Sequence, residues 1–338
     1  MSTFLRTVGF KLPELIETNE ELVEGFPGWT AEKIFAKTGI KSRHILSPGQ
    51  TPNDLISALC EDLIRENDID RSEIDLLILC TQSPDYLLPS NACLLQHSLG
   101  LPTACGAFDY NLGCSGFTYG LWLAQGMVSS GQCRNVLIAT GDAYSRYCRH
   151  TDIGIRCLFG DAAGAAIVGR QEIGSLARVI GSNVGTDGRG AEHLIVKQGG
   201  QKAASLGASQ LSLPCLSMNG PEVFSFTLRT VQCSIKELLA GLGWSMESVD
   251  KFLLHQANAF MLEKLGDSMG LDANRLPIDL ADTGNTVSST LPILLTRCQE
   301  KGLLQQGMKY VLSGFGVGLS WCNTGLEWMM DSGSEKRS

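Results

Sequence analysis

A single cysteine lies between small residues in the stretch DYNLGCSGFTYGL, residues 109–121. The run AFDYNLGC predicts a strand that ends at Cys114, and SGFTYGLWLAQ predicts the helix that follows. A thiol at a helix N-terminus meets unpaired N–H groups and the positive end of the helix dipole, which lower its pKa and favour nucleophilic attack. Gly113 and Gly116 permit a tight turn and leave room for a substrate. A cysteine that only packs in the core is the alternative, and this stretch alone does not decide between them.

A long internal echo supplies further candidates. EIDLLILCT at 73–81 resembles SVDKFLLHQ at 248–256, and NVLIATG at 135–141 resembles KYVLSGF at 309–315, with offsets of 175 and 174 residues. Each segment is an aliphatic run typical of a buried strand. The two offsets predict two similar α/β halves, 1–170 and 171–338, joined in one compact body.

The same offset relates Cys114 to a second predicted turn. Adding 174 or 175 to its number gives Ser288–Ser289 in DTGNTVSSTLPILL, a stretch that also contains Asn285. LLHQAN places His255 directly after a predicted strand. Because ligands of α/β sheets bind at the carboxyl ends of the strands, we expect this cysteine, histidine and asparagine to meet in one site.

Helical patterns separate the strand-like runs. The segments 52–68, 115–131 and 221–243 carry apolar residues at helical spacing, and the last begins with proline and ends in glycine. Strands that alternate with helices predict an α/β fold with a mostly parallel, covered sheet.

Composition limits the class of protein. The chain has 338 residues, is 43% hydrophobic and 18% charged, and carries a net charge of −8, which disfavours a nucleic-acid-binding surface. No apolar run approaches the roughly 18–20 residues of a membrane helix, and no signal peptide is evident, so we expect a cytoplasmic protein without a membrane span. The nearest of the twelve cysteines are nine residues apart, a spacing that argues against a metal site. Eleven of them are expected to be buried, reduced thiols.

Four motifs together resemble the β-ketoacyl-[acyl-carrier-protein] synthase III family. They are NLGCSGFTYGL, LFGDAAGAAIV, LLHQAN and GNTVSSTLP, and the likeness runs from AKTGIKSRHI at 36–45 to SGFGVGLSW at 313–321. The resemblance implies a thiolase-like fold, in which duplicated halves stack as five layers α-β-α-β-α. It also implies a homodimer.

The resemblance implies a reaction as well. Cys114 would take an acyl group from acyl-coenzyme A or an acyl carrier protein, with N–H groups of Cys114 and of the Gly316–Val317 loop holding the oxyanion. His255 and Asn285 would then donate hydrogen bonds to a malonyl thioester, carried on coenzyme A or on the carrier protein, as it loses CO2. Phe315 would keep water out, and no metal or other cofactor is required.

Several positions depart from the family pattern. Lys33 stands where the family has a tryptophan that stacks on the adenine of coenzyme A, and Lys37 replaces an arginine. Ile153 replaces an arginine that meets the coenzyme A phosphate, and Phe260 replaces an arginine associated with carrier-protein docking. Val317 replaces a glycine. The changes at Lys33 and Ile153 favour an unusual acyl donor or a carrier-protein donor over coenzyme A.

Further substrate contacts are predicted around these positions. Lys33, Lys37 and Arg156 are candidates to restore part of the phosphate contact, and Asn258 of HQAN is a candidate substrate-binding residue. Leu88 in YLLPSNAC resembles a residue that reaches across the dimer toward the partner's pocket.

Other functions stay open as alternatives. A biosynthetic thiolase would need a second cysteine in SGFGVG, which has none. A type III polyketide synthase shares the Cys–His–Asn trio, although KTGI and FGDAAGA favour synthase III. A non-condensing acyltransferase and an inactive partner subunit are the remaining possibilities, and the intact trio argues against the inactive subunit.

Overall fold

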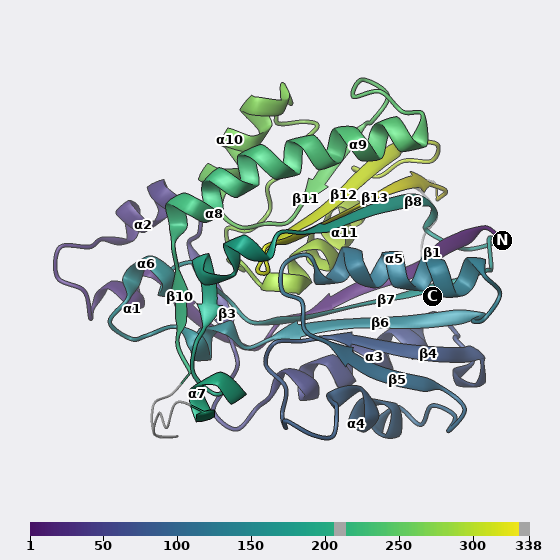
Figure 1. Cartoon of the computed structure of the whole chain (residues 1–338), viewed down its shortest axis with the longest axis horizontal. Helices are drawn as coiled ribbons and strands as arrows, with labels where there is room; N and C mark the ends of the chain where they lie inside the picture. Colours follow the sequence, from purple (N-terminus) through teal and green to yellow (C-terminus); the bar gives the residue numbers. More distant parts are fainter. Residues whose placement is uncertain (206–213, 331–338) are drawn as a thin grey trace.

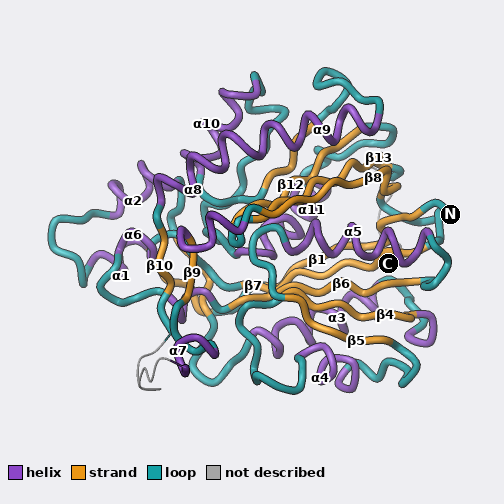
Figure 2. Tube along the Cα trace, in the orientation of Figure 1, coloured by secondary structure: helices purple, strands orange, loops and turns teal. Residues whose placement is uncertain are grey.

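A mixed nine-stranded sheet runs through the computed structural model, which describes residues 1–205 and 214–330 (Figures 1 and 2). Its order is β11-β12-β13-β8-β1-β7-β6-β4-β5. The strands are β1 (Thr3–Lys11), β4 (Ile74–Cys80), β5 (Gly106–Tyr110), β6 (Asn135–Asp142), β7 (Ala162–Gly169), β8 (Ala177–Thr186), β11 (Lys251–Leu254), β12 (Lys309–Gly316) and β13 (Ser320–Trp328). Two small sheets pair β2 (Leu15–Thr18) with β3 (Ser42–Ile45), and β9 (Leu194–Val196) with β10 (Leu216–Met218).

The directions of the strands repeat across the sheet. β4 is parallel to β6, and β7 is antiparallel to both β6 and β1. In the same order, β11 is parallel to β12, and β13 is antiparallel to both β12 and β8. The segments of the sequence echo fall on β4 and β11, and on β6 and β12. The division into halves 1–170 and 171–338 stays a prediction, and antiparallel pairing of β1 with β8 joins the two sets of strands in one sheet.

Helices cover the sheet in layers, as the thiolase-like fold requires. α3 and α4 pack on one outer face, and α9 packs on the other against β8 and β13. α5 and α11 lie between the two parts of the sheet and contact strands of both (Figure 1). The helices are α1 (Asn19–Val23), α2 (Ala31–Thr38), α3 (Pro52–Glu66), α4 (Asn91–Ser98), α5 (Gly116–Ser129), α6 (Ile153–Arg156), α7 (Gln201–Ser205), α8 (Gly220–Phe226), α9 (Gln232–Leu242), α10 (Ala259–Met269) and α11 (Thr290–Glu300). Short helical turns are η1 (Arg71–Glu73), η2 (Tyr144–Tyr147), η3 (Gly188–His193), η4 (Thr227–Val231) and η5 (Val287–Ser289).

The central layer explains why the sequence lacks clean alternation in its strands. β6 and β7 are buried at every residue, because helices cover both faces of the sheet. On α5, Phe117, Leu121 and Val128 are fully buried against both parts of the sheet. Each such side chain stabilises the fold by about 1.5–3 kcal/mol. The helix that carries the cysteine turn is therefore held rigidly from both sides.

Some predicted boundaries were wrong. The strand predicted to end at Cys114 ends at Tyr110, because the chain turns through Asn111–Ser115, where the Gly116 N–H donates to Gly113 O at 2.7 Å. The helix predicted at 221–243 is divided by η4, a π-helical turn, between α8 and α9. The predicted burial of eleven cysteines also fails, since Cys93 and Cys233 are exposed.

Within residues 1–205 and 214–330, every helix is too short or too polar to span a lipid bilayer.

Candidate active site

The three residues predicted to act together line one cavity of about 460 Å³. Cys114 precedes α5, His255 follows β11, and Asn285 lies just before η5. The fold therefore brings together side chains that are 141 (255 − 114) and 30 (285 − 255) residues apart in the sequence.

The rest of the cavity wall is largely apolar. It includes Leu158, Phe159, Met218, Val223, Met261 and Phe315. Cavities of this size and polarity suit small molecules with an apolar body and few polar groups. An acyl chain has this character, and water is poorly accommodated beside such a wall.

Cys114 is 6% exposed, and its environment differs from the one predicted. Burial raises the pKa of the Cys114 thiol to about 12, and the nearby Asp142 carboxylate adds to the rise. The N–H groups of Cys114 and Val317 act in the opposite direction on this pKa. The predicted lowering of the pKa at the helix terminus was therefore wrong, because loss of hydration outweighs the N–H groups. A thiol of this kind is protonated at neutral pH and needs a proton acceptor before it attacks.

Gly316 brings the β12–β13 loop against this cysteine. A β-carbon at Gly316 would lie 2.9 Å from both Cβ and Sγ of Cys114, closer than real side chains approach. The absence of a side chain is what lets the Val317 N–H reach the nucleophile. The N–H groups of Cys114 and Val317 thus have the placement that an oxyanion site requires.

His255 is 1% exposed and held by its backbone and its ring. Its N–H donates to Ser313 O at 2.8 Å, and its Nδ1 lies 2.7 Å from Oγ1 of Thr290. The ring packs edge-to-face with Phe315, with 5.5 Å between ring centroids. Burial lowers the pKa of His255 to about 3, so the imidazole is neutral at neutral pH.

Asn285 is fixed by contacts of both its backbone and its amide. Its N–H donates to Leu158 O at 2.8 Å, and its carbonyl accepts the Gly160 N–H at 3.1 Å. Its side-chain Oδ1 accepts the Val287 N–H at 2.9 Å. Because Oδ1 is engaged, the Nδ2 amide is left as the donor at the cavity wall, and no residue in the described ranges hydrogen-bonds to it.

Sequence reasoning missed a buried acid beside the nucleophile. Asp142 ends β6 and accepts hydrogen bonds from the Gln82 N–H at 2.7 Å and the Ser288 hydroxyl at 3.1 Å. Burial raises its pKa to about 7. An acid directly after the aliphatic run NVLIATG was the available signal, since a buried strand end seldom carries an unpaired carboxyl group.

Three predicted phosphate contacts lie outside the cavity lining. Lys33 Nζ donates to Gly28 O at 2.8 Å, and Lys37 Nζ lies 4.8 Å from the ring centroid of Trp29. Arg156 forms an ion pair with Glu17. The Lys37 and Arg156 cations thus already have partners within the protein.

Of the other two predicted contacts, one lines the cavity. Asn258 does so while its side chain caps α10 through the Met261 N–H at 2.8 Å. Leu88 lies outside this cavity and is 83% exposed.

The two substituted arginine positions have different surroundings. Phe260 lines the cavity, is 49% exposed and stacks on Phe224, with 5.8 Å between ring centroids. Ile153 is buried with Leu22, Ile34 and Cys157. An aromatic pair therefore stands beside the cavity where the family pattern has a cation.

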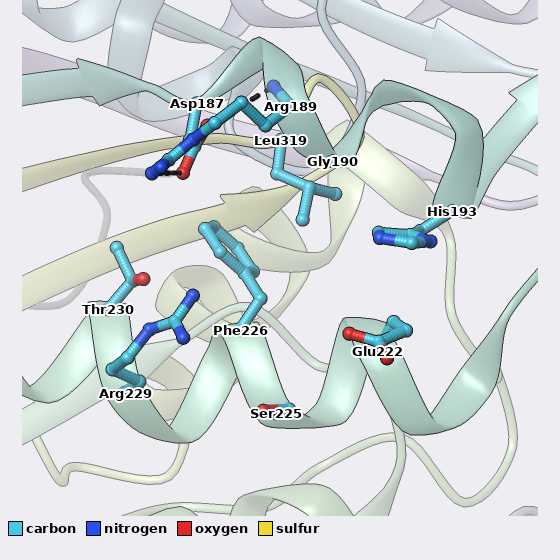
Figure 3. A pocket seen from close by; sticks show the side chains of 10 residues that line it. All are labelled: Asp187, Arg189, Gly190, His193, Glu222, Ser225, Phe226, Arg229, Thr230 and Leu319. Atoms are coloured by element: carbon cyan, nitrogen blue, oxygen red, sulfur yellow. Dashed lines mark hydrogen bonds and ion pairs between the residues drawn. The ribbon is translucent and has the colours of Figure 1, made fainter.

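A second pocket of the same volume, about 460 Å³, does not contain the trio. Asp187 and Arg189 form an ion pair on one side, and Glu222 and Arg229 project from α8 and η4 on the other (Figure 3). Volume therefore does not distinguish the two pockets, but chemistry does. The cavity with the thiol, the imidazole and the amide is the candidate active site.

Comparison with known proteins agrees with this chemistry. The family model for 3-oxoacyl-[acyl-carrier-protein (ACP)] synthase III matches residues 108–188, and the model for its C-terminal part matches residues 239–328. The β-ketoacyl-[acyl-carrier-protein] synthase III of Caldanaerobacter subterraneus subsp. tengcongensis is 36% identical over 95% of this chain and 96% of its own length. That of Gloeobacter violaceus is 37% identical over 93% of this chain and 94% of its own length. The chain belongs to the synthase III family.

Solved structures support the same family and fold. A 3-oxoacyl-(acyl-carrier-protein) synthase III is 42% identical and covers 97% of this chain and all of its own, with a TM-score of 0.89. The priming β-ketosynthase of a polyketide biosynthetic pathway is 28% identical and covers 98% of this chain and 97% of its own, with a TM-score of 0.88. The protein is thus a condensing acyltransferase of the synthase III type with a thiolase-like fold.

Proposed function

We propose that this synthase III loads an acyl group on Cys114 and condenses it with a malonyl thioester to give a β-ketoacyl thioester, in fatty acid or specialised acyl-chain biosynthesis. The observation that carries the proposal is the shared cavity of Cys114, His255 and Asn285. Each residue supplies one functional group that the reaction needs: a nucleophilic thiol, an imidazole and an amide donor. The apolar wall suits the acyl chain.

Loading is the first half of the proposed reaction. The sulfur of Cys114 attacks the carbonyl carbon of the acyl thioester, and the donor thiol leaves. The oxyanion of the tetrahedral intermediate would lie against the N–H groups of Cys114 and Val317. Because these donors are fixed by α5 and the Gly316 loop, they need little reorganisation as charge develops.

Condensation is the second half. The malonyl thioester loses CO2, and negative charge grows on its thioester oxygen. His255 and Asn285 are the polar groups of the trio that remain available to meet this oxygen. The carbanion then attacks the acyl carbon on Cys114, and the thiolate leaves.

The donors and partners are part of the proposal. Acyl-coenzyme A or acyl carrier protein would bring the starter, and malonyl carrier protein or malonyl-coenzyme A the extender. Lys33, Lys37, Arg156 and Asn258 stay candidate substrate contacts. We place the reaction in the cytoplasm.

A homodimer is also proposed. β5 is one of the two edge strands of the large sheet, and Phe108 on it is 42% exposed. Leu87 and Leu88 are 88% and 83% exposed in a loop between β4 and α4. An open edge strand and exposed apolar side chains suit pairing with a second copy. Light scattering at several protein concentrations tests this, and a mass that stays that of one chain would refute it.

Polyketide priming is the second candidate. Similarity to a priming β-ketosynthase and the aromatic pair at Phe224 and Phe260 favour it. A panel of starter thioesters separates the candidates, because simple short-chain starters indicate fatty acid initiation, whereas strong preference for unusual starters indicates a specialised pathway.

Intact mass spectrometry tests the proposed function directly. Incubation with acyl thioesters should add one acyl group that maps to Cys114. The Cys114→Ser variant should load far more slowly than the parent or not at all. Cys93→Ser, which changes an exposed cysteine, is the matched control and should load normally. Loading of Cys114→Ser at the parent rate would refute the assignment of the nucleophile.

A further inference from the structure

The second pocket shares a wall with the active cavity. This wall is the helix formed by α8 and η4, which presents different residues to its two sides. Val223 and Thr227 line the active cavity, whereas Glu222, Ser225 and Arg229 line the second pocket. Figure 3 shows Glu222 and Arg229 projecting from this one helix into the pocket. The two spaces are therefore neighbours across a single helix.

Arg229 is a cation without a direct partner. It lies in η4, a π-helical turn of a kind that is frequent at functional sites. Its guanidinium makes no hydrogen bond or ion pair with another residue of the ranges 1–205 and 214–330. The carboxylate on the opposite wall, Asp187, is already held through both oxygens by Arg189, at 2.8 and 2.6 Å. Because an arginine fork matches carboxylate and phosphate groups, Arg229 is available to bind an anion.

The cations predicted to meet a donor phosphate are less available. Lys37 lies over the ring of Trp29, and Arg156 is paired with Glu17. Ile153 carries no charge at all. Coenzyme A and acyl carrier proteins present the acyl group on the same phosphopantetheine arm, so either donor brings a phosphate that needs a cation. Arg229 is an unpaired cation in the pocket next to the active cavity.

The other lining residues suit the part of the arm next to its phosphate. That part carries two methyl groups and a hydroxyl group. Phe226 and Leu319 are buried apolar residues of the pocket, and the carboxylate of Glu222 can accept a hydrogen bond from the hydroxyl. Pro221 lines the active cavity, so an arm that leaves the cavity at the start of α8 passes Glu222 first. Arg229 then lies about 10 Å further along the helix.

The pocket is held in shape by contacts within the protein. Asp187 and Leu319 exchange backbone hydrogen bonds of 2.8 and 3.2 Å. The Asn219 N–H donates to His193 O at 2.8 Å, and the Asn219 side chain caps α8 by accepting the Glu222 N–H at 3.4 Å. These contacts tie the walls together before any ligand binds. A preformed pocket loses less conformational freedom on binding.

We propose that the second pocket binds the phosphate of the donor's pantetheine arm, with Arg229 as its cationic contact. This inference rests on the proposed function and moves the phosphate contact to the far side of α8 from the active cavity. It concerns the phosphate that both kinds of donor share. The changes at Lys33 and Ile153 still weaken binding of coenzyme A, because its nucleotide has no counterpart on a carrier protein.

Calorimetric binding of free pantetheine and of 4′-phosphopantetheine tests the proposal without catalysis. The parent should bind phosphopantetheine roughly tenfold more tightly, as expected for a charge-assisted hydrogen bond at an exposed site. Arg229→Gln should bind the two probes about equally. Arg65→Gln is the matched control, because Arg65 is an exposed arginine on α3 that lines neither pocket, and it should behave as the parent. Equal affinities in the parent, or a preference that survives in Arg229→Gln, overturn the proposal.

Loading kinetics distinguish the source of the phosphate. In Arg229→Gln, KM should rise by a similar factor, roughly tenfold, for one acyl chain on coenzyme A and on carrier protein, while kcat changes little. A rise for the carrier protein alone would indicate docking of that protein's surface, and a rise for coenzyme A alone would indicate a nucleotide contact. Either result overturns the proposal. A protein that binds phosphopantetheine through Arg229 but loads no acyl group refutes the proposed function and leaves the phosphate site standing.

Discussion

The side-chain oxygen of Asn285 accepts the backbone N–H of Val287 at 2.9 Å. Val287 has a φ of 57°, in the left-handed region that β-branched residues rarely adopt. Such a conformation costs about 1–3 kcal/mol and persists only where neighbouring contacts hold it. Asn285 therefore has two tasks, since its oxygen supports this turn while its nitrogen faces the cavity.

Asn285→Asp should separate these tasks. Aspartate keeps an oxygen for the Val287 N–H but cannot supply the Nδ2 donor, so decarboxylation should slow by about 100–1000-fold while acyl loading continues. Release of CO2 from a malonyl thioester and acyl loading by intact mass give the two rates. Asn285→Ala is the comparison variant that also loses the bond to Val287, and should have a lower melting temperature. Equal loss of both rates in Asn285→Asp would contradict the separate role in decarboxylation.

Gly316→Ala should block loading. Its new β-carbon would meet the sulfur of Cys114 at 2.9 Å, so either the thiol or the loop that carries Val317 must move. Displacing one oxyanion donor typically slows a reaction by about 100-fold or more. Gly126→Ala on α5 is the control, because a β-carbon there meets nothing within 4 Å. Loading assays quenched at successive times compare the rates of the variants. Parent-like loading by Gly316→Ala would show that loading does not depend on the close contact between this loop and Cys114.

Asp142→Asn should change how stability depends on pH. The pKa of Asp142 is raised from 3.8 to about 7 in the folded protein, so its contribution to stability is full below pH 3.8 and is lost as the pH rises through 7. An asparagine lacks this loss. The difference in unfolding free energy between variant and parent should therefore shift in favour of Asp142→Asn as the pH rises from about 4 to 7.

Denaturant unfolding at several pH values measures this difference. Asp68→Asn, at an exposed position, is the control and should show no such trend. A difference between Asp142→Asn and the parent that stays constant over this range would show that Asp142 does not resist ionisation.

An acyl group carried on coenzyme A should load less efficiently than the same acyl group carried on a carrier protein. Lys33 and Ile153 stand where the family pattern has an adenine-stacking tryptophan and a phosphate-binding arginine. A stacking contact contributes roughly 0.5–2 kcal/mol and a charge-assisted phosphate contact about 1.5–3 kcal/mol. Losing both weakens binding by roughly 30-fold or more.

The ratio of loading efficiencies for one acyl chain on the two carriers checks this expectation. Phe260→Arg is the comparison variant: it restores the arginine that the family pattern associates with carrier-protein docking, so it should raise loading from the carrier protein without raising loading from coenzyme A. A clear preference of the parent for the coenzyme A thioester would contradict this prediction. It would instead favour an enzyme that starts acyl chains from acyl-coenzyme A.

Much of the site could be predicted from local sequence. Cys114, His255 and Asn285 each follow or precede a recognisable strand or helix, and the periodicity of those elements depends only on neighbouring residues. The echo between 73–81 and 248–256 likewise located segments that occupy corresponding strands, β4 and β11. Residue types and their order were therefore enough to identify the family, and the three residues predicted from them line one cavity.

Tertiary structure alone decided how these groups behave. The pKa of Cys114 rises because the assembled layers exclude water, although its helix-terminal position alone predicts the opposite shift. The contact of Thr290 with His255, 35 residues away, depends on how α11 packs behind β11. Burial and side-chain contacts arise only when distant segments meet. A linear pattern therefore specifies the reacting groups but not their protonation states or their hydrogen-bond partners.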